Sequence, residues 1–250
     1  MRKPLDYLLI RALKRGVEST NEDARNLIIS FVKGQMTEEH SFKNRGGKGD
    51  LYYTMFGWML CYVLNIDTDN AKRKAYLARM KTEELDALHK TVIEQCEMVD
   101  KLLEGGLWRA AIGNWRRRHR IERFFGQFVK HTIGRSVNGE AARLLVGSDA
   151  TKSHRAVVER EEKKDALEYI RGMQDETGGF LANEGAAMPD LLTTAVALFT
   201  LKMFDTKPRY DALNFIDIHF NDDGSFIPNI IDEQSDVEYM FYGLLALGSC

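Results

Sequence analysis

Apolar residues recur at helical spacing along most of the chain, with polar residues between them. Residues 22–33 follow a Ser-Thr-Asn capping signal and carry apolar side chains on one face until Gly34. Residues 82–105 begin at Thr82, end at a glycine, and place their apolar side chains in one stripe. A strand-like alternation is confined to residues 225–231. The pattern predicts an all-α protein.

Two segments near the end of the sequence, 166–203 and 212–249, repeat the same motif. Each runs from an apolar helix through a glycine turn to a phenylalanine, and then to an aspartate that opens a second apolar helix. Phe180 and Asp190 recur 46 residues later as Phe226 and Asp236. Such self-similarity is typical of helical repeat proteins.

A third copy of the second half of the motif lies at residues 50–62, where Gly57 matches Ala197 and Gly243. The residue types have a physical explanation. An aspartate at a helix start accepts a bond from a free backbone N–H, and a glycine before it allows a reversal with positive φ. The phenylalanine can fill the seam between neighbouring hairpins, and a small residue in the helix permits close approach. Each unit is therefore expected to be an outer helix, a turn and an apolar inner helix.

These segments resemble the prenyltransferase and squalene-oxidase repeat found in α/α-toroid proteins. The resemblance rests on residues 174–180, on Pro189-Asp190, and on residues 46–54, which are similar to a segment of protein prenyltransferase β subunits. Clear copies cover residues 24–66, 166–203 and 212–249. The resemblance implies an α/α toroid-like domain of helical hairpins spanning residues 1–250. The length allows about five units, fewer than the family's usual toroid, so we expect an incomplete ring or an irregular middle.

In zinc-dependent protein prenyltransferases, the resemblance implies that an Asp, a Cys and a His bind a metal that holds the substrate thiolate. Leu192 and Glu238 stand where the Cys would be needed, and Tyr53 stands where the His would fall. We therefore expect no zinc and no other cofactor. Asp50, Asp190 and Asp236 are interpreted first as helix caps. No residue is an evident acid, base or nucleophile, so the sequence leaves open whether the protein is an enzyme.

Aromatic residues on two inner helices provide the candidate ligand site. They could line a central cavity that accommodates an isoprenoid or lipid chain, although packing of the core accounts for them equally well. The candidate ligand-binding residues near the helix starts are Tyr52, Tyr53, Phe56, Asp190, Asp236, Tyr239 and Tyr242.

A basic segment, residues 109–123, supplies candidate groups for a diphosphate. Arg116, Arg117 and Arg120 could pair with its oxygens, but an amphipathic helix with a basic polar face explains the segment as well. As a third possibility, the same arginines could bind a nucleic acid or an anionic membrane surface. The formal net charge of −2 argues against it.

Composition and the apolar stretches indicate which compartment and which classes of protein to expect. The chain has 250 residues and 3 distant cysteines, without metal-ligand spacing. No signal peptide pattern is found at the start, and no apolar stretch approaches the ~20 residues of a transmembrane helix. We expect a cytoplasmic protein that binds or transforms an isoprenoid or lipid ligand. The alternative is a non-catalytic helical-repeat protein that binds a protein partner.

Overall fold

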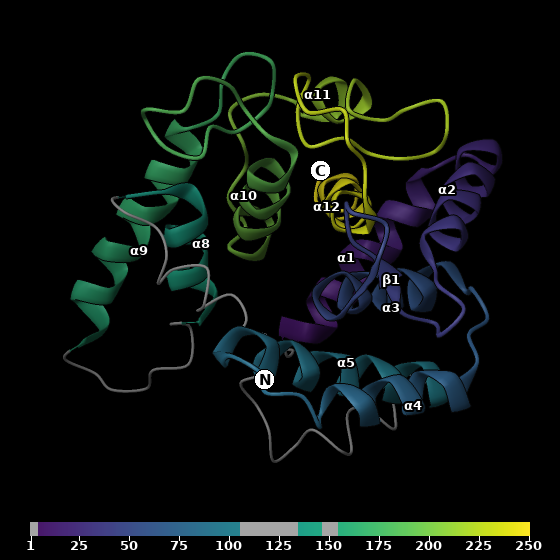
Figure 1. Cartoon of the computed structure of the whole chain (residues 1–250). Helices are drawn as coiled ribbons and strands as arrows, with labels where there is room; N and C mark the ends of the chain where they lie inside the picture. Colours follow the sequence, from purple (N-terminus) through teal and green to yellow (C-terminus); the bar gives the residue numbers. More distant parts are fainter. Residues whose placement is uncertain (1–4, 106–134, 147–154) are drawn as a thin grey trace.

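The computed structural model describes residues 5–105, 135–146 and 155–250, and arranges its helices around a ring (Figure 1). The prediction of an all-α fold is confirmed, because the strands among these residues are the two-residue β1 (Phe42–Lys43) and β2 (Gly49–Asp50). Residues 225–231 contribute only an isolated bridge between Phe220 and Phe226. The helices are α1 (Leu5–Ser19), α2 (Glu22–Gln35), α3 (Leu51–Leu64), α4 (Asn70–Met80), α5 (Ala87–Gly105), α8 (Val137–Val146), α9 (Arg155–Gly172), α10 (Leu191–Met203), α11 (Leu213–Asp217) and α12 (Val237–Leu247).

Three apolar helices, α10, α12 and α3, pack side by side as inner helices, in that order. This order places the first repeat of the sequence next to the last one in space. The turn at Gly178 lies against Asp211, just before α11, and the turn at Gly224 lies against Leu27 of α2. Since each turn contacts the outer helix of the following unit, residues 24–66 follow residues 212–249 around the ring.

The glycine turns have the predicted left-handed geometry. Gly178 and Gly224 have φ values of 92° and 82°. A Cβ atom at Gly178 would lie 2.1 Å from the carbonyl oxygen of Asp211, and one at Gly224 would lie 2.4 Å from the backbone of Leu27. Both the positive φ and the close approach therefore require glycine at these two positions.

Phe180 and Phe226, which follow the two turns, are buried in the seam between hairpins, as expected, and Phe42 is buried in the same way before the third inner helix. Phe42 and Phe180 each donate their backbone N–H to a threonine hydroxyl of the following inner helix, at 2.9 Å. The small residues of those helices have a different role from the one expected. A Cβ atom at Gly57 would lie 2.1 Å from the Phe42 ring. Gly57 thus makes room for a phenylalanine ring rather than for a neighbouring helix.

The three aspartates cap the inner helices, as predicted. The side chain of Asp50 accepts the N–H groups of Tyr52 and Tyr53 at 2.8 and 3.2 Å. Asp190 and Asp236 cap α10 and α12 in the same way. The predicted start at Thr82 is wrong by about one turn, since α5 begins at Ala87. There the carboxylate of Asp86 accepts the N–H of His89 at 2.8 Å and supplies the cap.

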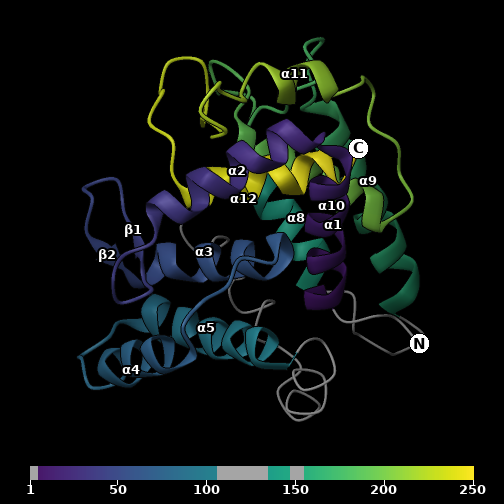
Figure 2. The ribbon, with the colours of Figure 1, turned by 90° about the vertical axis from the view of Figure 1, so that its right-hand side faces the viewer.

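Helix α1 crosses the carboxyl ends of the inner helices, at the far end of the ring from the turns (Figure 2). A Cβ atom at Gly16 would lie 1.9 Å from the carbonyl oxygen of Leu244, and one at Gly248 would lie 1.8 Å from that of Ala12. The two backbones therefore touch, and Arg15 Nε donates to the Gly248 carbonyl at 2.8 Å. The amino ends of the inner helices lie at the opposite end. None of the described helices is both long enough and apolar enough to cross a membrane.

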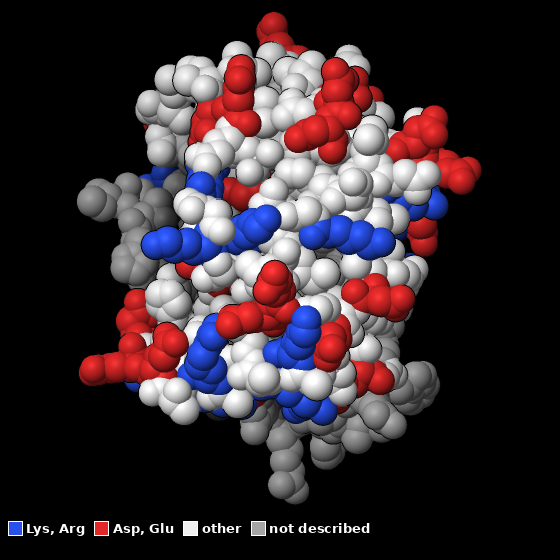
Figure 3. Space-filling view, turned by 45° about the vertical axis from the view of Figure 1, so that its right-hand side comes forward, with Lys and Arg blue, Asp and Glu red and all other residues white. Residues whose placement is uncertain are grey.

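Charges are unevenly distributed over the face shown in Figure 3. At its top, where α11 and the neighbouring loops are found, the charged side chains are acidic, whereas in its middle and lower parts lysine and arginine side chains lie among acidic ones. In the lower part, basic residues of α4 pair with acidic ones, as in the ion pair between Arg79 and Glu39 at 2.6 Å. The top of the face is therefore the more negative region.

Candidate functional site

The amino ends of α3 and α12 bring together the aromatic residues predicted from the sequence. The Tyr52 ring lies 5.6 Å from the Tyr53 ring and 5.1 Å from the Phe56 ring, between centroids. Across the helix interface, Phe56 lies 5.9 Å from Tyr242, which lies 6.5 Å from Tyr239. We call these five residues the aromatic cluster.

The aromatic cluster has a packed inner part and an open outer part. Phe56 and Tyr242 are buried, with 1% and 3% of their surface exposed, and both contact the ring of Phe241. Tyr52, Tyr53 and Tyr239 are only partly buried. The inner residues therefore belong to the core, while the outer three tyrosines could contact a ligand.

Glu238 adds a carboxyl group to the cluster, a role that the sequence analysis missed. The Tyr52 hydroxyl donates a hydrogen bond of 2.7 Å to Glu238 Oε1. Burial raises the pKa of Glu238 to about 7, and the negative charge of Asp236 acts in the same direction. The carboxyl group is therefore partly protonated near neutral pH. An acidic residue within the apolar run of residues 237–247 was the available signal.

Arg45 is the second residue that the sequence analysis missed. Its Nε donates to Asp236 Oδ2 at 2.9 Å, its Nη1 donates to Asp232 Oδ2 at 2.8 Å, and its guanidinium lies 5.4 Å from the centre of the Tyr239 ring. Burial lowers the pKa of Arg45, but the hydrogen bonds to both carboxylates outweigh it and raise the pKa. Asp236 thus caps α12 and holds Arg45 across the seam between the last and first repeats.

Asp190 lies at the start of α10, in the neighbouring unit. Its carboxylate accepts the backbone N–H and the hydroxyl of Thr193, both at 2.7 Å, while burial raises its pKa. His219 is 1% exposed, and its Nδ1 lies 2.7 Å from the Phe215 carbonyl oxygen. Its Nε2 is buried without a hydrogen-bond partner among the described residues. Burial accordingly lowers the pKa of His219 and favours the neutral ring.

The positions implied for zinc ligands hold Tyr53, Leu192 and Glu238 at the starts of three inner helices. Within the described ranges, no group of three or more His, Cys, Asp and Glu side chains is arranged to hold a metal ion. The absence of zinc stays a prediction. Arg116, Arg117 and Arg120 lie outside the described residues, so their pairing with a diphosphate also stays a prediction.

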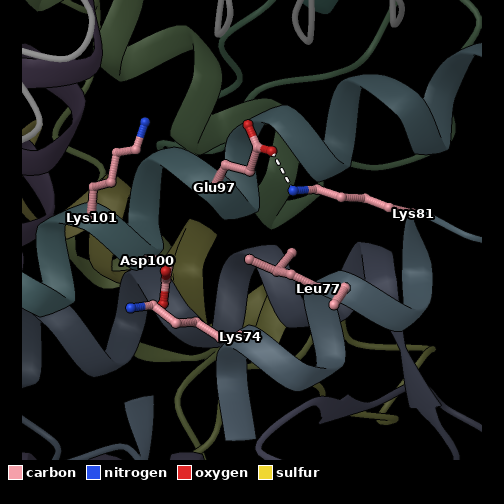
Figure 4. Close-up of a pocket in the computed structure, with 7 residues that line it drawn as sticks. Lys74, Leu77, Lys81, Glu97, Asp100 and Lys101 are labelled. Carbon is pink, nitrogen blue, oxygen red and sulfur yellow. Dashed lines mark ion pairs between the residues drawn. The ribbon is translucent and has the colours of Figure 1, made fainter. Parts of the chain in front are cut away.

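A groove of about 560 Å³ lies between α4 and α5 (Figure 4), and none of its lining residues belongs to the aromatic cluster. Its cationic groups are largely neutralised. Lys81 pairs with Glu97 at 2.8 Å, and Asp100 at its floor pairs with the buried Arg73 at 2.8 Å. Paired charges of this kind stabilise the contact between the two helices and leave little positive charge for an anionic ligand.

Comparison with known proteins identifies the family. No curated protein and no solved structure matches the sequence. A family model, described as the prenyltransferase alpha-alpha toroid domain, matches residues 120–249, which include the repeats at 166–203 and 212–249. The match covers more than half of the chain and agrees with the observed units of outer helix, glycine turn and capped inner helix. The chain therefore belongs to the prenyltransferase alpha-alpha toroid domain family.

Proposed function

We propose that this protein binds an isoprenoid or related lipid at the aromatic cluster, without the zinc of the family's protein prenyltransferases. The observation that carries the proposal is the placement of Tyr52, Tyr53 and Tyr239. These partly buried rings come from two repeats and meet around the enclosed carboxyl group of Glu238. An apolar chain laid against them would be removed from water, with a gain of ~25 cal/mol per Å² of apolar surface.

The polar groups of the cluster suit an alcohol better than a diphosphate. In the part of the chain that the structure describes, the hydroxyls of Tyr53 and Tyr239 have no hydrogen-bond partner and could orient a ligand hydroxyl. Arg45 is already paired with two carboxylates. A diphosphate would therefore need cations from elsewhere, for which Arg116, Arg117 and Arg120 are the candidates.

The alternative is a non-catalytic helical-repeat protein that binds a protein partner. It is supported by the packing of Phe56, Phe241 and Tyr242, whose rings fill the inner part of the cluster in mutual contact. Residues that fill a core in this way stabilise the scaffold whether or not a ligand binds.

Calorimetry with farnesol and farnesyl diphosphate tests the proposal. We expect farnesol to bind, and the replacements Tyr53→Ala and Tyr239→Ala to weaken binding about tenfold each, since each removes ring contact worth ~1.4 kcal/mol. The matched control is Tyr210→Ala, which truncates an exposed tyrosine outside the cluster.

The two ligands separate the possible outcomes. Equal binding of both indicates a lipid carrier, while preference for the diphosphate that is lost on Arg116→Ala or Arg120→Ala indicates an enzyme-like site. Binding of neither ligand, or binding unaffected by Tyr53→Ala and Tyr239→Ala, contradicts the proposal and leaves the helical scaffold as the better explanation.

A further inference from the structure

Most of the exposed large apolar side chains lie on α11 or on the segments that flank it in the sequence. Of the seven large apolar side chains that are exposed among the described residues, five lie between residues 210 and 231. A sixth, Leu27, belongs to the α2 segment that contacts the turn at Gly224. The seventh, Leu88, lies on α5. The five are Tyr210, Leu213, Ile218, Ile230 and Ile231, and together with Leu27 they form what we call the α11 edge.

Two segments of the chain build this edge, and a backbone hydrogen bond joins them. Helix α11 buries Phe215 and Ile216 and leaves Leu213 in solvent, and Ile218, which follows its last residue, is 60% exposed. The N–H of Ile227 donates to the His219 carbonyl at 3.0 Å, so the loop bearing Ile230 and Ile231 starts beside the end of α11, and it continues to Asp232, which pairs with Arg45. Ile231 is 74% exposed. Apolar exposure of this extent on neighbouring segments is typical of an interaction surface.

The same segments carry negative charge that is not neutralised. Of the seven acidic residues between positions 205 and 233, Asp232 pairs with Arg45, whereas the other six are exposed and form no ion pair with another described residue. Lys207 and Arg209 are the only basic residues in that range. The acidic top of the face in Figure 3 corresponds to this region. The six exposed acidic residues are Asp205, Asp211, Asp217, Asp222, Asp223 and Glu233.

We propose that the α11 edge docks a basic amphipathic segment of a protein partner. Ile218 and Ile231 would insert between apolar side chains of that segment, and the surrounding carboxylates would pair with its lysines or arginines. An anionic membrane surface would be repelled by the same carboxylates, so the charge of the edge favours a protein over a lipid bilayer. This surface lies outside the aromatic cluster, and the inference does not depend on isoprenoid binding.

Fluorescence anisotropy with a synthetic peptide tests the inference. The probe is an amphipathic helix of leucine and lysine, and its matched control carries glutamate at every lysine position. We expect the lysine peptide to bind, with an affinity that falls as salt rises, and the glutamate peptide not to bind. A double variant, Ile218→Ser with Ile231→Ser, should weaken binding at least about tenfold, the effect of losing ~1.4 kcal/mol of apolar contact.

Control variants locate the effect on this surface. Leu88→Ser removes the exposed apolar side chain that lies elsewhere and should leave binding unchanged. Asp217→Asn with Asp222→Asn should reduce the salt dependence. Edge variants that bind like the unaltered protein, or an equal loss with Leu88→Ser, would overturn the inference. So would binding to phosphatidylserine vesicles that is lost in the double isoleucine variant, because it would assign the surface to a membrane.

Discussion

Replacing Glu238 by glutamine should stabilise the protein at high pH and not at low pH. In the folded protein the pKa of Glu238 rises from its ordinary value of 4.5 to about 7, mainly through burial. Between these values the folded state holds a proton that the unfolded state has lost, so the stability of the unaltered protein falls as pH rises through this window. Glutamine has no charge to bury, and its side-chain oxygen can still accept the hydrogen bond that Tyr52 now donates at 2.7 Å.

The size of the effect follows from the pKa. At 1.36 kcal/mol for each tenfold change in proton affinity, the burial of charged Glu238 costs about 3 kcal/mol above pH 7. Below pH 5 most of this cost disappears. The advantage of Glu238→Gln over the unaltered protein should therefore grow by about 2 kcal/mol between pH 5.5 and pH 8.

Urea unfolding at pH 5.5 and pH 8 measures this difference directly. The control is Glu84→Gln, because Glu84 is exposed in the loop before α5 and its replacement should give no such gain. A stability difference for Glu238→Gln that is the same at both pH values would refute the reasoning, since only the titration of an enclosed carboxyl group makes it vary. Destabilisation at both pH values would show that the carboxyl group itself, protonated or charged, is required for packing.

Two further predictions concern the seam and the turns. Arg45→Ala leaves the carboxylate of Asp236, which is 2% exposed, without its cation, and should lower the free energy of unfolding by about 2 kcal/mol. Arg79→Ala, which breaks an exposed pair, should change it little, and equal effects in thermal melts would contradict this explanation. Gly178→Ala should destabilise the fold by about 3 kcal/mol or more because of its positive φ and the nearby backbone. Gly34→Ala, in a helix with open space, should stabilise it by about 0.5 kcal/mol, and a gain for both would refute the argument.

Features that depend on residues close to one another in the sequence could be predicted from it. An aspartate followed by an apolar helix caps that helix through N–H groups two or three residues away, so the caps at Asp190 and Asp236 could be predicted without tertiary information. The glycine turns are equally local. The predicted helix start at Thr82 was wrong because Asp86, four residues later, offers a carboxylate that is a stronger cap. The helix therefore begins after Asp86.

The polar part of the candidate site could not be predicted, because it depends on contacts between distant residues. Arg45 and Asp236 are separated by 191 positions, and Tyr52 and Glu238 by 186. Nothing in the local pattern of either segment indicates that they meet. The aromatic residues, in contrast, could be predicted to lie together. The repeat places corresponding positions of each inner helix at the same end of the ring.

The order of the repeats explains why the candidate site joins both ends of the chain. Residues 24–66 follow residues 212–249 around the ring, as the contact between Gly224 and Leu27 shows. The first unit therefore covers one side of α12, and Arg45 fixes the two units together at their amino ends. Tyr52 and Tyr53 come from one side of this seam, and Glu238 and Tyr239 come from the other. A change that loosens the seam should consequently alter the aromatic cluster as well as the stability of the ring, so the two properties are coupled at the same few residues.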